Sequence, residues 1–306
     1  MQLKVWIKNA RLRTLPLSCS AVLAGVFLGL SQLTTIDSIA YYVILSTLIM
    51  ITAVFLQVIS NYANDYGDSI SGADNENRVG PKRGLMRGDF TRSQLKRAII
   101  TLVLITMIVG LLTLILAFYD NPFALFSFIS LGALSLIGAI TYTVGLVYGY
   151  KGLGDVSVFI FFGLVAVLGA SYIISKTFDI NTLIFGMMSG FMAVMVLNVN
   201  NLRDHKNDSL TNKNTLIVKF GLSFGKKYHF ILLLLSICCG IYLLSPYFLA
   251  NYLWLMFLIV FIPLLKSAIF CINKNHVDAQ LDPMLKKTSI SASLINICYG
   301  ALFLIC

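Results

Sequence analysis

Long apolar runs separated by polar connections make up most of this chain. A helix that crosses the ~30 Å hydrocarbon core of a bilayer needs about 20 apolar residues, because each backbone amide must be paired within the segment. The pattern therefore predicts an all-α membrane protein with nine transmembrane helices in a single domain over residues 1–306. The predicted spans are residues 15–34, 40–63, 97–118, 122–143, 155–175, 180–200, 228–246, 248–265 and 288–306.

The composition agrees with lipid as the solvent. Of the 306 residues, 58% are hydrophobic and 12% are charged, and the mean hydropathy is +0.85. A soluble domain is about half apolar and twice as charged. The six cysteines have no CxxC spacing and the three histidines are scattered, so the sequence indicates neither a zinc site nor a redox site.

The net charge of +10 would point to nucleic acid in a soluble protein, but its distribution indicates a membrane topology. Of the 23 Lys and Arg residues, only Lys176 falls in a connection on the side opposite the N-terminus. The positive-inside rule therefore predicts a cytoplasmic N-terminus and a C-terminus outside. We expect a lipid bilayer, and no nucleic acid, among the partners.

Two long cytoplasmic connections, residues 64–96 and 201–227, carry most of the polar chemistry. Each begins with N-x-x-x-D at the end of an apolar run, and each has a further Asp downstream. These residues are Asn64, Asp68 and Asp74 in the first connection and Asn200, Asp204 and Asp208 in the second. Side chains four residues apart share one face of a helix, so each pair can direct its oxygens at one point. Two such faces could form a cage.

The clustered carboxylates need a counter-charge at a membrane surface. Oxygen ligands without Cys or His favour Mg²⁺ or Ca²⁺, and Mg²⁺ commonly shares its coordination sphere with phosphate oxygens. The interleaved bases suit an anionic substrate; they are Arg78, Lys82, Arg83, Arg87, Arg203, Lys206 and Lys213. Metal, bases and lipid together indicate a lipid diphosphate. Alternatively the acids cap helices or pair with loop arginines, which would be ordinary for one such motif but not for two at matching helix ends.

A third connection on the same side, residues 142–155, is rich in Gly and Tyr. Glycine lets the backbone approach a ligand closely, and the rings of Tyr142, Tyr148 and Tyr150 offer faces to a cation or an arene. By itself this segment would be a turn with interfacial tyrosines. Its position beside both acidic motifs makes it a candidate part of the same site.

Together these motifs resemble the UbiA superfamily of intramembrane aromatic prenyltransferases, and within it the branch that acts on 1,4-dihydroxy-2-naphthoate in menaquinone synthesis. The matching segments are R-x-x-T-L-P at 11–16, N-D-Y-G-D at 64–68, R-x-G-P-x-R-G at 78–84, G-Y-x-G-L-G-D at 149–155, N-N-x-R-D-x-x-x-D at 200–208 and K-N-T-L at 213–216. The chain departs from the family at 146–148, where Leu-Val-Tyr replaces an expected proline.

The resemblance implies Mg²⁺-dependent transfer of a polyprenyl chain to the naphthoate ring, with loss of diphosphate and CO₂ to give demethylmenaquinone. It also implies a bacterial cytoplasmic (inner) membrane location with the active site facing the cytoplasm. The implied catalytic residues are Asp65, Asp68, Asp204 and Asp208. The implied metal ligands are Asn64, Asp68, Asp74, Asn200, Asp204 and Asp208. Expected diphosphate ligands are Arg78, Lys82, Arg83 and Lys151, and expected acceptor ligands are Arg11, Arg13 and Tyr142.

Other functions fit the sequence less well. Prenyltransferases that act on 4-hydroxybenzoate or haem share the acidic motifs, but the position of Asp74 favours the naphthoate branch. A CDP-alcohol phosphotransferase would carry D-G-x-x-A-R, which is absent. A cation-coupled transporter would place its carboxylates near the bilayer midplane on broken helices, whereas these acids lie at the ends of the predicted spans.

Overall fold

The computed structural model describes residues 3–11, 14–76, 78–250 and 252–305, and within these ranges the chain is helical without strands. The α-helices are α1 (Leu3–Asn9), α2 (Leu15–Ser31), α3 (Ile39–Ser71), α4 (Arg92–Phe118), α5 (Pro122–Thr141), α6 (Gly154–Val158), α7 (Ala166–Ser175), α8 (Ile180–Leu210), α9 (Leu216–Ala250), α10 (Ile262–Ile272) and α11 (Asp282–Ile305). A π-helical segment, η2 (Phe159–Val165), joins α6 to α7. Short 3-10 turns complete the fold as η1 (Tyr148–Lys151), η3 (Tyr252–Phe261) and η4 (Asp278–Leu281).

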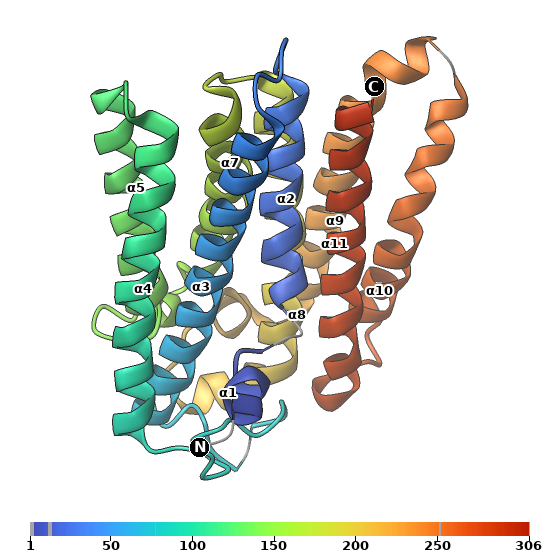
Figure 1. The fold of residues 1–306 in the computed structure, drawn as a ribbon. Helices are drawn as coiled ribbons and strands as arrows, with labels where there is room; N and C mark the ends of the chain where they lie inside the picture. Colours follow the sequence, from blue (N-terminus) through green and yellow to red (C-terminus); the bar gives the residue numbers. More distant parts are fainter. Residues whose placement is uncertain (1–2, 12–13, 77, 251, 306) are drawn as a thin grey trace.

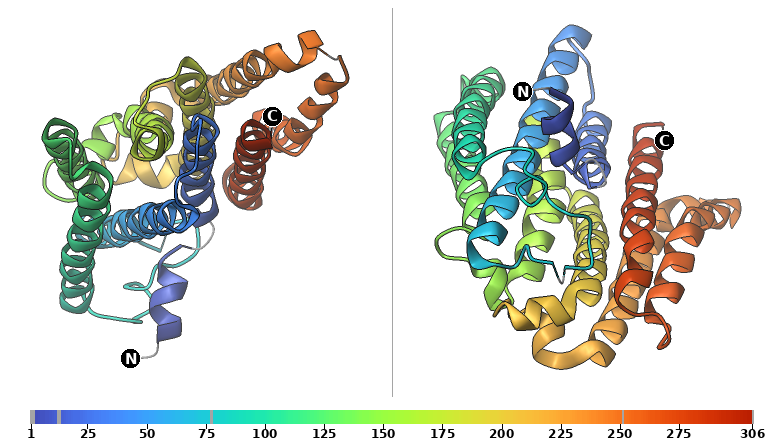
Figure 2. Two further views of the ribbon diagram at one scale, coloured as in Figure 1. Left: turned by 45° about the horizontal axis from the view of Figure 1, so that its top comes forward. Right: turned by 90° about the horizontal axis from the view of Figure 1, so that it is seen from below.

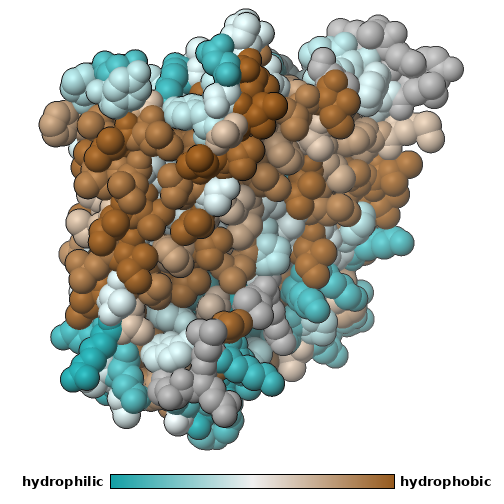
Figure 3. Space-filling view, viewed as in Figure 1, coloured by the Kyte–Doolittle hydropathy of each residue, from teal (hydrophilic) through white to brown (hydrophobic). Residues whose placement is uncertain are grey.

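Seven helical segments in the described part of the chain are long and apolar enough to cross a membrane. Of two shorter apolar segments, Leu15–Ser31 lies within the first predicted span, and Met256–Ile272 overlaps part of the eighth. Large apolar side chains point outward from α4 and α5, among them Leu104, Ile108 and Phe126. Figure 3 shows a hydrophobic band across the middle of the molecule, with hydrophilic residues at both ends.

The predicted ends of two helices are wrong, because α3 and α8 continue well beyond their apolar stretches. α3 runs to Ser71 and stops at Gly72, which adopts the left-handed conformation with φ 78°. α8 runs to Leu210. Neither polar segment contains a proline, and the helix continues without a break through both. The Asn and Asp residues in these segments therefore stand on helical turns. The connections that remain are residues 72–91 and 211–215, much shorter than predicted.

These two polar helix ends lie at the same end of the bundle. In Figure 1, α1, the 72–91 connection and the ends of α3 and α8 gather at the bottom, while the C-terminus lies near the top. Seen from below, the 72–91 connection crosses the end of the bundle (Figure 2). The fold thus concentrates the acidic and basic residues on one face of the protein.

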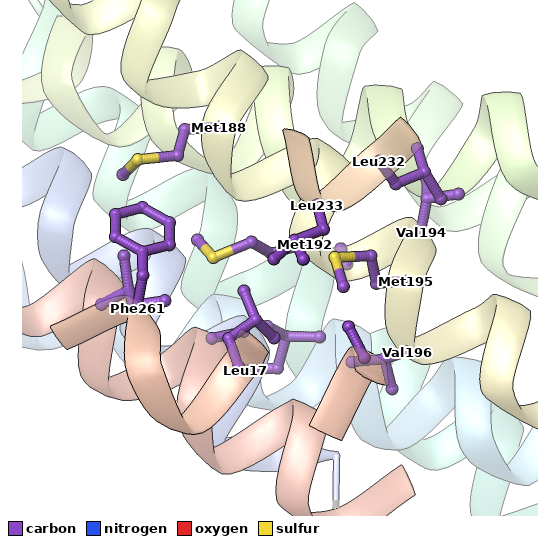
Figure 4. Packing of buried hydrophobic residues seen from close by; sticks show 14 of the residues in the cluster. Leu17, Met188, Met192, Val194, Met195, Val196, Leu232, Leu233 and Phe261 are labelled. Carbon is purple, nitrogen blue, oxygen red and sulfur yellow. The ribbon is translucent and has the colours of Figure 1, made fainter. Parts of the chain in front are cut away.

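The main hydrophobic core is formed by α2, α8, α9 and α11. Figure 4 shows its centre, where Met188, Met192 and Met195 of α8 meet Leu233 of α9 and Phe261. Close helix contact on the other face of α8 depends on Gly163 of η2, since a Cβ there would lie 2.5 Å from the Gly190 Cα. α8 is thereby fixed from both sides, which holds its polar end in place.

Candidate active site

A cavity of about 400 Å³ lies between α2, α3, α4, α5, the α6–α7 segment and α8. Its inner wall is apolar over most of its length, with Ile49, Leu114, Phe128 and Ile173 at the end far from the acidic motifs. The other end is polar and charged. The lining residues there are Arg11, Asn61, Asn64, Asp68, Arg78, Arg83, Asn200, Asn201 and Lys213.

The first acidic motif occupies the last turns of α3. Gly67 lets the end of α5 come close enough for Thr143 Oγ1 to donate to Asn64 Oδ1 at 3.2 Å. Asp68 is buried and accepts a 2.6 Å hydrogen bond from Tyr150 Oη. Burial and then the Asp68 carboxylate raise the pKa of Tyr150, so this tyrosine is a neutral donor. Asn64 and Asp68 therefore face the cavity in fixed orientations.

Asp65 is turned away from the cavity, and its carboxylate pairs with Arg11 and with Arg83, whose Nε is 3.4 Å away. Burial acts to lower the pKa of Arg11, but the Asp65 carboxylate raises this pKa above its usual value. Burial, reinforced by the charges of Arg11 and Arg78, lowers the pKa of Arg83 to about 9. Asp65 thus holds two cavity-lining cations and is not itself part of the lining.

Asp74 follows Gly72 in the 72–91 connection and returns toward α3, where its amide donates to the Asp68 carbonyl at 3.2 Å. Arg78 Nε lies 3.3 Å from Asp74 Oδ1. Neither Asp74 carboxylate oxygen, although buried, accepts a hydrogen bond. Burial raises the pKa of Asp74 to about 6, against the opposing charge of Arg78.

The second acidic motif occupies the last turns of α8. Asp208 lies 3.7 Å from Lys213 Nζ, and its buried Oδ2 accepts no hydrogen bond. Lys213 also lies over the Tyr150 ring, 5.3 Å from its centroid. Burial would lower the pKa of Lys213, but Asp68 and Asp208 together raise it. Lys213 therefore connects the two acidic helix ends, because it lies beside Asp208 of α8 and over the ring of Tyr150, whose hydroxyl donates to Asp68 of α3.

A direct contact also joins the two motifs, since Asn207 Nδ2 of α8 donates to the Ala73 carbonyl at 2.8 Å. Asp204 receives two hydrogen bonds from the Arg203 guanidinium, and Asn200 receives one. Of the residues expected to hold a metal, Asn64, Asp68 and Asn200 line the cavity. Asp74, Asp204 and Asp208 lie close by, in the connection after α3 and on the last turns of α8, but they are not part of the lining.

No ready-made cluster of three or more His, Cys, Asp or Glu side chains for a metal exists among the described residues. Asp74, Asp204 and Asp208 each pair with a base, and Asp68 accepts from the Tyr150 hydroxyl. Hydrogen-bond-free carboxylate oxygens on Asp74 and Asp208, inside a set of oxygen donors only, nevertheless fit a hard cation. Magnesium suits such a set, because it needs one or two carboxylates and takes further oxygens from phosphate.

The predicted substrate ligands divide into two groups. Arg11, Arg78, Arg83 and Tyr142 line the cavity. Lys82 and Lys151 do not, since both are exposed; Lys82 lies 3.9 Å from Glu76, and the Lys151 carbonyl accepts from Lys219. Arg13 lies outside the described residues.

The sequence indicates Lys213 only as one of several bases, although it stands five residues after Asp208 in the K-N-T-L segment, and it assigns no role to Asn207. The sequence predicts that the Tyr150 ring offers a face to a cation or an arene, and Lys213 lies over it. The hydrogen bond from the Tyr150 hydroxyl to Asp68 is not indicated by the sequence. Tyr150 lies in the Gly- and Tyr-rich connection, and its backbone carbonyl accepts from the Asn214 amide at 2.8 Å. This hydrogen bond joins the 148–151 turn to the segment after α8, a pairing that no local pattern indicates.

A charged pocket opening into an apolar chamber, inside a bundle of apolar helices, defines a membrane-embedded site for an amphiphile with an anionic headgroup. The sequence agrees with this class, because residues 18–285 match the model of the UbiA prenyltransferase family. The chain belongs to the UbiA prenyltransferase family and is an integral, multi-pass membrane prenyltransferase.

Two curated relatives are similar over nearly their whole length. The chain is 39% identical over 303 residues to the 1,4-dihydroxy-2-naphthoate octaprenyltransferase of Haemophilus influenzae, covering 98% of this chain and 95% of the relative. It is 37% identical over 297 residues to the enzyme of the same name from Escherichia coli, covering 97% and 94%.

The fold is also similar to a solved structure. A UbiA homologue from Archaeoglobus fulgidus, bound to DMAPP and Mg²⁺, superposes with a TM-score of 0.62 over 96% of this chain and 98% of that chain. The sequences are 15% identical, so this likeness shows the shared fold.

Proposed function

We propose that this protein transfers a polyprenyl chain from polyprenyl diphosphate to 1,4-dihydroxy-2-naphthoate. The C1–O bond of the donor breaks, a bond forms between C1 and the ring carbon that bears the carboxylate, and that carboxylate leaves as CO₂. The products are diphosphate, CO₂ and the quinol form of demethylmenaquinone, because the step involves no oxidant. The observation that carries the proposal is the meeting of two acidic helix ends at the charged end of an apolar cavity. The acceptor follows from the names of the relatives.

The residues that would hold Mg²⁺ are Asp68, Asp74, Asp204 and Asp208, with the amide oxygens of Asn64 and Asn200. When bound, Mg²⁺ supplies positive charge to the leaving diphosphate oxygens. Arg78, Arg83 and Lys213 line the same end of the cavity and bind the remaining phosphate oxygens through charge-assisted hydrogen bonds. Their charge also favours departure of the diphosphate, because it is fixed in place before the reaction begins.

The walls of the cavity protect and orient the organic reactants. Tyr142, Tyr148 and Phe161 surround the region next to the polar end, where their rings exclude water and stabilise an allylic cation. Arg11 lines the cavity with its charge held by Asp65 and binds the acceptor carboxylate. The apolar remainder receives the prenyl tail, whose length requires a site open to lipid.

We further propose that the enzyme resides in the bacterial inner membrane with nine spans and with its active site facing the cytoplasm. The distribution of Lys and Arg along the chain, with only Lys176 in a connection on the opposite side, supports this orientation. In that position the diphosphate donor and the charged acceptor both reach the cavity from the aqueous side.

Detergent-purified protein with all-trans polyprenyl diphosphate, Mg²⁺ and either 1,4-dihydroxy-2-naphthoate or 4-hydroxybenzoate tests the proposal. We expect a prenylated, decarboxylated naphthalene product, and none when EDTA removes the metal. Prenylation of 4-hydroxybenzoate alone would refute the acceptor, and activity in excess EDTA would refute the role of Mg²⁺.

Substitution of single acids tests the cage. Asp68→Ala and Asp204→Ala each remove one proposed metal ligand, so we expect turnover to fall at least a hundredfold while membrane insertion is retained. Asp37→Ala, in an exposed connection remote from the cavity, is the matched control and should retain wild-type turnover. Near-normal activity in either Asp68→Ala or Asp204→Ala would contradict the cage.

A further inference from the structure

Arg203 is a buried cation next to the site that does not line the cavity. It lies on α8 between Asn200 and Asp204, and its side chain is 3% exposed. The guanidinium makes four hydrogen bonds, all of them to protein side chains. Its charge is therefore directed at carboxylates of the protein and not at a substrate.

Two of these bonds fix the plane of one carboxylate. Arg203 Nε donates to Asp204 Oδ1 at 2.8 Å, and Nη2 donates to Asp204 Oδ2 at 2.6 Å. An ionised carboxylate offers about four lone-pair positions, so this fork uses one on each oxygen and leaves the other two for a cation. Nη2 also donates to Asn200 Oδ1 at 2.8 Å. One guanidinium thus orients two of the proposed metal ligands.

The remaining edge of the guanidinium binds a residue from a distant part of the chain. Arg203 Nη1 donates to Asp282 Oδ1, at the start of α11, at 2.7 Å. Without Asp282, the charge of Arg203 would cancel that of Asp204 and leave little attraction for a cation. With it, two carboxylates share one guanidinium, and the group keeps a net charge of about −1.

The 72–91 connection also contacts this group. Gly80, buried in the 72–91 connection, lies so close to Arg203 that a Cβ there would stand 2.7 Å from Nη2. Arg203 is therefore enclosed by α8, by α11 and by the connection that carries Asp74 and Arg78. Small displacements of α11 would be transmitted through Asp282 to the Asp204 carboxylate.

We propose that Arg203 and Asp282 are positioning residues of the diphosphate site: Arg203 orients Asp204 and Asn200, and Asp282 balances its charge so that Asp204 retains its affinity for a divalent cation. This inference rests on the proposed function. It adds α11 to the elements that determine the geometry of the site.

Binding of Mn²⁺, followed by electron paramagnetic resonance without substrate, separates this role from packing. We expect Asp282→Asn to weaken Mn²⁺ binding about tenfold, the lower end of the effect of losing an outer-shell partner of a metal ligand. The matched control is Asp278→Asn, which breaks the 2.6 Å ion pair between Asp278 of η4 and Lys206 of α8. It removes the same charge from the neighbouring turn without touching Asp204, so Mn²⁺ affinity should stay within twofold of wild type.

Arg203→Lys provides a second variant, because a lysine keeps the charge but cannot form the two-pronged contact with Asp204. We expect it to weaken Mn²⁺ binding and to lower kcat more than it raises KM for the acceptor. Asp282→Glu, which restores the carboxylate, should recover most of the affinity lost in Asp282→Asn.

The outcomes discriminate between the two proposals. Equal Mn²⁺ affinity in wild type and Asp282→Asn would overturn the positioning role, as would equal weakening in Asp282→Asn and Asp278→Asn. A loss of thermal stability in Asp282→Asn with unchanged Mn²⁺ affinity would show that Asp282 only fastens α11 to α8, and would also overturn it. Wild-type protein that binds no Mn²⁺ would instead refute the metal cage of the proposed function.

Discussion

At the scale of single residues, the acids of the two motifs have different partners and therefore different tasks. Asp65 holds Arg11 and Arg83, Asp204 is held by Arg203, and Asp208 lies beside Lys213. Asp68 accepts from a neutral hydroxyl, which orients the carboxylate without cancelling its charge. The spacing of the motifs in the sequence does not distinguish the roles of these acids.

Tyr150→Phe tests the role assigned to this hydroxyl. Loss of the 2.6 Å hydrogen bond to Asp68 frees the carboxylate to rotate, and we expect kcat to fall about tenfold, in line with other outer-shell partners of metal ligands. The Tyr150 ring stays in place under Lys213, so thermal stability in detergent should change little. Tyr41→Phe, which removes a hydroxyl that donates to the Leu116 carbonyl far from the site, serves as the control. A Tyr150→Phe enzyme as active as Tyr41→Phe would contradict the role.

The residue types allow the chemistry of the site to be predicted from the sequence. They do not show which acid pairs with which base. Oxygen donors, interleaved bases and an apolar surrounding follow from composition and spacing. The direction in which Arg203 points depends on Asp282, 79 residues away, and on Gly80. Lys82 and Arg83 are adjacent in sequence, yet only Arg83 lines the cavity, because the turn of the 72–91 connection exposes its neighbour.

At the scale of helices, hydropathy located the apolar segments but not the ends of α3 and α8. Both helices continue through polar turns because their hydrogen bonds are internal and the polar side chains find partners in the site. A hydropathy pattern indicates where the chain leaves the lipid, but it does not indicate where a helix ends in water. The extra turns of α3 bring Asp68 to the cavity, and those of α8 carry Asp204 and Asp208 beside its polar end.

α5 differs from α3 and α8, because one regular face of this helix lines the cavity over most of the length of the helix. The residues on this face are Phe128, Leu131, Gly132, Ser135, Gly138, Ala139 and Tyr142. A Cβ at Gly132 would meet no atom within 4 Å. Gly132 stands about 15 Å along the helix from Tyr142 at 1.5 Å per residue, well inside the apolar region.

Gly132→Phe should therefore shorten the usable cavity. An isoprene unit spans at most about 5 Å at 1.5 Å per carbon–carbon bond, so we expect turnover of long polyprenyl donors to drop at least tenfold, with little change for dimethylallyl diphosphate. Competition assays with donors of graded length measure the shift. Ala133→Phe adds similar bulk to the exposed face of the same helix and should leave the length profile unchanged. Equal loss with short and long donors in Gly132→Phe would contradict this use of the cavity.

At the scale of the whole molecule, the uneven distribution of Lys and Arg along the chain and the arrangement of the helices indicate the same end of the bundle as the one that carries the site (Figure 1). We expect a cysteine introduced at Lys82, which is exposed, to react with a membrane-impermeant maleimide only in inverted membrane vesicles. One introduced at Asp37, also exposed and in the connection between α2 and α3, should react only from the periplasmic side. The reverse labelling pattern would contradict the proposed orientation.

The aromatic residues beyond the far end of the cavity have a consequence for the cell. Phe128, which lines the cavity, packs against Phe118 and Tyr172 with ring centroids 5.0 and 5.5 Å apart, and Phe118 and Tyr172 are themselves 6.1 Å apart. These rings join α4, α5 and α7 into an apolar wall behind a chamber whose other end is lined by charged residues. An enzyme built in this way can handle ionic reactants within an energised bilayer without giving protons a path that would dissipate the electrochemical gradient.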